Sequence, residues 1–229
     1  MGLALGDLSP LELMAEQARL TLTVDEIRRQ IAIFSNAIQG KSRELSQAVA
    51  LETELDTLTA LIEQETGVTV VWSRILGQLR AMEPQAYFGR IDFQADDDEE
   101  PLTIYVGTGW LHERATGRKL VYDWRTPVCD MYYRYEPGPA GFKAPMGRVD
   151  GEILLKRTYK VRRDELLEAI DSSGRANDEV LRNMLRRSTD GKMRTIVQTI
   201  QREQDDVIRN QQHPVLLVQG SAGSGKTSV

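Results

Sequence analysis

The chain has 229 residues, of which 41% are hydrophobic and 28% charged, a balance typical of a folded globular protein. Its single cysteine, Cys129, excludes an internal disulfide and a cysteine-based structural zinc site. No run approaches the roughly 20 apolar residues of a membrane span, and the N-terminus lacks the pattern of a secretory signal, so we expect a cytoplasmic protein without a membrane partner. The net charge of −5 is uneven: residues 1–115 hold 9 basic and 19 acidic side chains, and residues 116–229 hold 20 basic and 15 acidic ones. The basic second half fits either an ordinary solvated surface or a polyanionic partner.

Residues 9–82 are predicted to be helical, because apolar side chains recur there at helical spacing with some coiled-coil character. Ser9 can cap the first helix, and Pro10 fits its first turn. Breaks are expected at Gly40-Lys41 and at Thr66-Gly67. The pattern therefore predicts two or three helices folded as a hairpin. Such a hairpin either only packs on itself or projects from a globular body as an interaction arm.

The sequence changes character at Pro84, after which aromatic and β-branched residues alternate with turn signals. The acidic run Asp96–Glu100 is expected to be a solvated hairpin loop, and the stretch from Pro137 is a second loop by composition. These patterns predict a small, mostly antiparallel β element with strands at 87–93, 102–111, 120–124, 131–135 and 151–161.

Residues 163–212 return to helical patterns. We predict short helices from Asp164 and over 178–187, and a longer one over 195–210. The second region carries a basic cluster, for which a solvated face is favoured over contact with nucleic acid. The cluster consists of Arg182, Arg186, Arg187, Lys192 and Arg194.

A phosphate-binding loop follows this region. Val215–Gln219 is a short apolar run of the kind that forms a buried parallel strand, and GSAGSGKT comes directly after it and fits GxxxxGK[ST]. Glycines let the backbone curl around phosphate, and the loop N–H groups point at the anion. In this loop Lys226 reaches the β- and γ-phosphates, and the Thr227 hydroxyl is a ligand for Mg²⁺. The predicted nucleotide-binding residues are Gly220, Ser221, Ala222, Gly223, Ser224, Gly225, Lys226 and Thr227.

Gln204 stands 16 positions before this loop, on the helix that precedes the strand. A carboxamide offers both a donor and an acceptor, which matches the N6 and N7 edge of adenine. The sequence therefore favours ATP over GTP, with Mg²⁺ as its metal.

A Gln-bearing helix, a short strand and GSAGSGKT together resemble the opening of superfamily-one helicases of the UvrD/Rep type. Four further segments resemble the N-terminal region of HelD, a bacterial RNA-polymerase-associated ATPase related to those helicases. These segments are YFGRIDF (87–93), IYVGTGWL (104–111), VYDWRTPVCDMYY (121–133) and GEILLKRTYKV (151–161). The resemblance implies an α+β protein whose N-terminal helical hairpin enters RNA polymerase, with ATP-linked release of the polymerase from nucleic acid.

On this resemblance we divide the chain into a helical arm (1–83), a β-rich element (84–162) and the start of a RecA-like ATPase domain (163–229). The sequence ends two residues past Thr227 and includes neither a Walker B strand nor a second RecA-like domain. We therefore expect a fragment of a helicase-like hydrolase, truncated after the phosphate loop and inactive alone. Two alternatives are a stand-alone partner-binding protein and a fragment of a UvrD-type repair helicase, and DNA or RNA is a further candidate partner. The β-rich stretch ahead of the Gln helix speaks against the repair helicase.

Overall fold

The computed structural model describes residues 8–51 and 55–172 of the chain. Two long helices come first, α1 (Pro10–Leu51) and α2 (Leu55–Met82), and a seven-stranded sheet follows. Its strands lie in the order β3-β4-β2-β1-β6-β5, with β7 paired to β6. The strands are β1 (Gly89–Ala95), β2 (Leu102–Gly107), β3 (Leu111–His112), β4 (Lys119–Asp123), β5 (Gly138–Ala144), β6 (Gly147–Arg162) and β7 (Glu165–Asp171).

The sheet is mixed, since β2 and β4 run parallel while every other pair is antiparallel. The long strand β6 organises it by pairing with β1, β5 and β7 along different parts of its length. The predicted α+β class and the mostly antiparallel sheet are therefore confirmed. The predicted strand over 102–111 is two strands, β2 and β3, that pair with β4.

Three predictions for this region are wrong. The stretch from Pro137, expected to be a loop, contains strand β5, which pairs with β6. Residues 131–135 are not a strand but lie almost entirely in the short helix α3 (Asp130–Arg134), which follows the 3₁₀ turn Pro127–Cys129. The neighbours Met131 and Tyr132 are both buried in one core, whereas consecutive strand residues would point to opposite faces. The helix predicted from Asp164 is instead strand β7, so the sheet continues past residue 162.

The turn between β6 and β7 explains why the segment after Asp164 forms a strand and not a helix. Arg163 adopts a positive φ of 58°, and Arg162 pairs with Glu165 across it, which closes a tight hairpin. Strand β7 then buries Leu166 and Ala169 in the core beneath the helices. Pairing with β6 and burial under α1 therefore override the helical propensity of this segment.

Helix α1 begins as predicted, with Pro10 as its first residue. Ser9 and Glu12 form a reciprocal cap, because the Ser9 N–H donates to Glu12 Oε2 at 2.9 Å and the Glu12 N–H donates to Ser9 Oγ at 3.3 Å. The expected interruptions at Gly40 and Gly67 are wrong, since both glycines lie inside continuous helices. One glycine costs a helix only about 1 kcal/mol relative to alanine, which packing in a long hairpin offsets.

The Glu12 cap predicts a pH dependence of stability. Hydrogen bonds from Ser9, with a further contribution from Arg157, lower the pKa of the Glu12 carboxyl from 4.5 to about 2. A depressed pKa in the folded state means that the carboxylate stabilises the fold above pH about 4.5 and loses this effect as the pH falls towards 2. We expect Glu12→Gln to be less stable than the parent at pH 6 and the difference to shrink by pH 3. Urea unfolding at the two pH values measures it, and a difference that stays constant would contradict the prediction.

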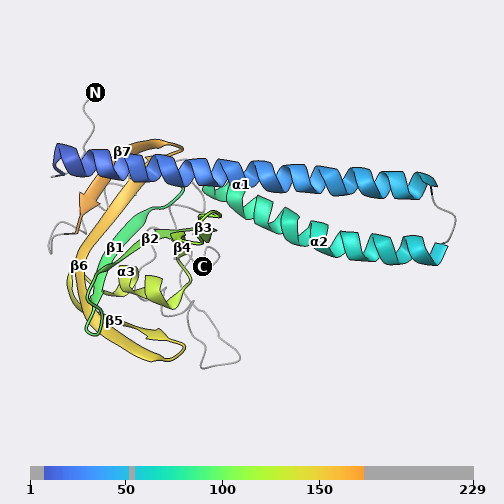
Figure 1. Cartoon of the computed structure of the whole chain (residues 1–229). Coiled ribbons are helices and arrows are strands. Elements are labelled where there is room, and N and C mark those ends of the chain that lie inside the picture. Colours follow the sequence, from blue (N-terminus) through green and yellow to red (C-terminus); the bar gives the residue numbers. More distant parts are fainter. Residues whose placement is uncertain (1–7, 52–54, 173–229) are drawn as a thin grey trace, which may run out of the picture.

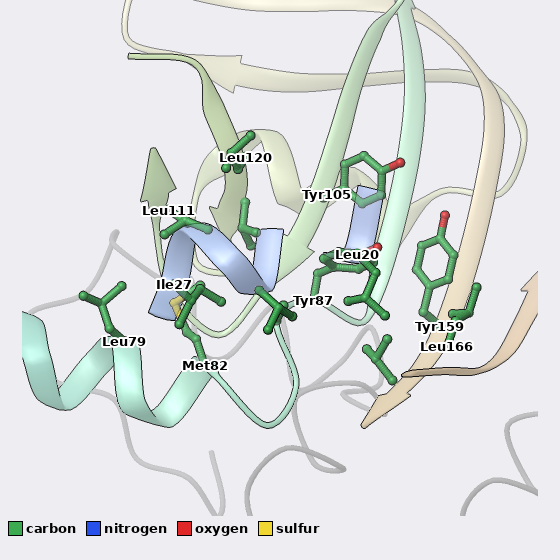
Figure 2. Close-up of a cluster of buried hydrophobic side chains, with 14 of the residues drawn as sticks. Leu20, Ile27, Leu79, Met82, Tyr87, Tyr105, Leu111, Leu120, Tyr159 and Leu166 are labelled. Atoms are coloured by element: carbon green, nitrogen blue, oxygen red, sulfur yellow. The ribbon is translucent and has the colours of Figure 1, made fainter. Parts of the chain in front are cut away.

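Both faces of the sheet are covered. Along β2, Tyr105 is buried on the face beneath the helices, while Ile104 and Val106 are buried on the opposite face with α3. Figure 2 shows the first of these cores, where Leu20 of α1 lies near Tyr87. The ring of Tyr159 in the same core belongs to β6. The first half of α1 therefore belongs to the globular body, and only its second half extends into the arm.

Candidate functional site: the helical arm and its anchor

The predicted nucleotide-binding residues, Gly220–Thr227 and Gln204, lie outside the described residues, as do the basic cluster and the predicted helices at 178–187 and 195–210. Their roles, including the Mg²⁺ ligand Thr227, stay predictions from the sequence. Among residues 8–51 and 55–172 no group of three or more His, Cys, Asp or Glu side chains is placed to hold a metal ion. The described part of the chain offers a different candidate site, the helical arm.

The arm extends well beyond the sheet (Figure 1). On α1 the last large side chain packed against the core beneath the helices is Phe34, and on α2 the first is Ile75. Beyond these two positions α1 and α2 continue away from the body, and the remaining 17 residues of α1 correspond to about 25 Å of helix. We define the distal arm as residues 35–74.

The distal arm presents apolar side chains to solvent. Val70 is 54% exposed and Val71 56% exposed on α2. A groove of about 420 Å³ lies between the two helices, with Ile38 and Leu45 of α1 facing Thr69 and Val70 of α2. Exposed apolar surface on an elongated element is typical of a contact site for a partner.

A buried carboxylate anchors α1 to the sheet. Glu16, with a side chain only 3% exposed, accepts hydrogen bonds from Arg157 Nη1 at 2.9 Å and from Arg90 Nη1 at 2.6 Å. The Tyr105 hydroxyl donates to its second oxygen at 3.2 Å. One side chain of the arm helix therefore joins strands β1, β2 and β6.

The two arginines of the anchor keep further carboxylate partners. Arg157 also donates from Nη2 to Asp171 on β7 at 2.9 Å, and Arg90 donates from Nη2 to Asp92 at 2.6 Å. Burial alone would lower the pKa of the Arg157 guanidinium, but Asp171 and Glu16 more than offset this and raise it. Burial, followed by the charge of Glu16, raises the pKa of Tyr105 to about 12. At neutral pH Arg157 therefore stays charged and the Tyr105 hydroxyl stays protonated.

A second attachment joins α1 to the backbone of the β3–β4 hairpin. Gln30 Nε2 donates to the His112 carbonyl at 2.7 Å, and Arg19 Nη2 donates to the Leu120 carbonyl at 2.8 Å. The buried Glu26 carboxylate accepts from the Arg114 N–H at 3.1 Å. With Glu16, these contacts fix α1 to the body at both ends of its buried half.

Sequence reasoning missed the anchor, although a signal was present. Leu13, Glu16, Leu20, Val24 and Ile27 follow the spacing of a helical apolar stripe, and Glu16 is the only charged residue in it. A carboxylate at a core position requires a cation in the facing layer. The anchor holds the arm in position; its charges are paired with one another, and no substrate-facing chemistry is assigned to it.

The N-terminal domain of DNA helicase IV HelD matches residues 13–184, which include the arm, the anchor and the whole described sheet. Comparison with curated proteins gives no significant match. Within the described ranges, neither long helix is apolar enough over a sufficient length to cross a bilayer. Because the match covers well over half of the sequence, this chain belongs to the HelD family through its helicase IV N-terminal domain.

Proposed function

We propose that this chain is the N-terminal part of an ATP-dependent, helicase-like motor whose distal arm binds RNA polymerase and helps to release it from nucleic acid. The observation that carries the proposal is the geometry of the arm. It is a pair of helices rigidly anchored at one end and extended beyond the body at the other (Figure 1). Such an element can reach into a recess of a large partner while the body stays outside.

The proposed energy source is ATP bound as Mg²⁺-ATP. Lys226 and Thr227 of the phosphate loop would hold the phosphates and the metal, and Gln204 would contact adenine. Membership in the helicase IV family supports this assignment. In a motor of this kind, ATP-linked movement would be passed to the arm through the body on which α1 is anchored.

The charge of the arm suggests the kind of surface that it meets. Within α2, residues 55–65 contain three carboxylates and no basic side chain. An acidic stretch on a projecting element favours a basic surface on the partner, and such a contact weakens as salt rises.

Removing the distal arm tests the proposal. Deletion of the whole arm is unsuitable, because Leu20, Val24 and Ile27 belong to the core of the body. Residues 37–73 are instead replaced by a Gly-Ser linker of about six residues, which spans the ~10 Å between packed helices. We expect this variant to keep its thermal unfolding midpoint within a few degrees and to lose at least tenfold in affinity for purified bacterial RNA polymerase.

The matched control carries neutral residues in the acidic loop Asp96–Glu100, which is exposed between β1 and β2. This control removes a similar amount of charge from the body and should bind polymerase like the parent. The proposal fails if the variant with the shortened arm, shown to be folded by circular dichroism, retains the polymerase as well as the parent does.

A further inference from the structure

The outer face of the β3–β4 hairpin carries a cluster of aromatic and basic side chains. Leu111 and Val121 are buried in the core beneath the helices, Trp110 and His112 beside them are exposed, and Tyr122 is partly buried against the core on the opposite face of the sheet. Trp110 is 39% exposed, and its ring is nearly parallel to that of His112, at an interplanar angle of 12° with the centroids 6.0 Å apart. Trp110, His112, Lys119 and Tyr122 are called the hairpin patch below.

Positive charge accompanies these rings. Lys119 Nζ lies 5.7 Å from the centre of the Trp110 ring and 5.4 Å from that of Tyr122. Within the part of the chain that the structure describes, no carboxylate pairs with Lys119. Arg118 is exposed on the same hairpin and forms only a loose pair with Glu113 at 3.8 Å, whereas the Arg114 guanidinium lies over the Phe34 ring of α1, 6.0 Å from its centre. The patch is therefore cationic although the first half of the chain is strongly acidic.

The hairpin patch is held rigidly from behind. Gln30 of α1 fixes the His112 carbonyl, and Gly109 lies so close to Gln78 and Met82 of α2 that a Cβ atom would fall 2.6 Å from the Gln78 side chain. Exposed rings on a fixed backbone lose little conformational freedom when they bind a planar group.

We propose that the hairpin patch binds single-stranded nucleic acid, with a base stacked on Trp110 and phosphates close to Lys119 and Arg118. An exposed tryptophan ring with a neighbouring lysine matches an unpaired base on a polyanionic backbone. A duplex hides its base faces, and a protein partner would need its own carboxylates to meet these cations. This inference is independent of the contact between the arm and polymerase.

The test uses the full 229-residue chain and a fluorescent oligothymidylate of about 15 nucleotides, a length in the range of one binding site. Anisotropy titrations should give about tenfold weaker binding for Trp110→Ala, while Trp110→Phe keeps a ring and most of the affinity. Lys119→Ala should reduce the slope of log affinity against log salt by about 0.7, the value for one phosphate contact on a single strand.

Matched controls are Trp72→Ala on α2 and Lys143→Ala on β5, which lie away from the hairpin and should bind like the parent. Quenching of tryptophan fluorescence by the oligonucleotide should disappear in Trp110→Phe and persist in Trp72→Ala. The inference is overturned if the parent does not bind, if it binds a duplex of equal length as tightly, or if Trp110→Ala and Lys119→Ala bind as the parent does.

Discussion

Replacing Glu16 with alanine is expected to lower the free energy of unfolding by about 3 kcal/mol, the lower end of the cost of removing one partner from a buried ion pair. The loss leaves Arg157, 2% exposed at its side chain, without its closest link to α1. The cost stays at the lower end because Arg157 keeps Asp171 and Arg90 keeps Asp92. Urea unfolding at pH 7 measures the change.

Glu44→Ala is the matched control for this substitution. Glu44 stands on the same helix and pairs with Lys41 at 2.9 Å, but its side chain is 67% exposed. Removing such a surface pair should cost less than about 1 kcal/mol. Equal losses of stability in the Glu16→Ala and Glu44→Ala variants would show that the buried carboxylate does not hold α1 to the sheet.

Substituting Gly151 with alanine is expected to destabilise the sheet by several kcal/mol or to prevent folding. A Cβ atom at this position would lie 2.1 Å from the carbonyl oxygen of Gln94 and 2.8 Å from the Cα atom of Ala95, both on strand β1. Backbone atoms cannot yield as a flexible side chain can, so β1 and β6 would have to separate where they pair. Circular dichroism and thermal unfolding of the purified variant test this expectation.

Gly77→Ala is the matched control, and it is expected to change the stability in the opposite direction. Gly77 is exposed in the interior of α2, and no atom lies within 4 Å of a Cβ built there. Alanine should therefore stabilise the helix by up to about 1 kcal/mol. If Gly151→Ala unfolds at the same temperature as the parent, the close approach of β1 and β6 does not exist in solution.

Local sequence signals predicted the parts of this fold that local physics determines. Ser9 and Pro10 marked the start of α1, and the alternation over 87–93 marked β1. Gly40 and Gly67 misled because a long helical hairpin tolerates the cost of single glycines. The register of β7 against β6 depends on a partner strand, and no pattern within residues 164–170 reveals it.

In the candidate site, too, local sequence predicts one part, and long-range contacts determine the other. The existence of an arm follows from helical periodicity, whereas its attachment depends on Arg90 and Arg157, which stand 74 and 141 positions from Glu16 in the sequence. Those pairings are long-range, so only the three-dimensional arrangement shows them. The hairpin patch likewise combines residues whose common face becomes visible only once β3 and β4 are paired.

The continuity of α1 gives the arm a mechanical property. One unbroken helix forms part of the core in its first half and part of the arm in its second half, so it acts as a lever whose fulcrum is the Glu16–Gln30 segment. With about 25 Å of helix beyond Phe34, a tilt of about 10° in the body would move the tip by about 4 Å. A small rearrangement at the far side of the sheet would thus be magnified at the end of the arm and not absorbed along it.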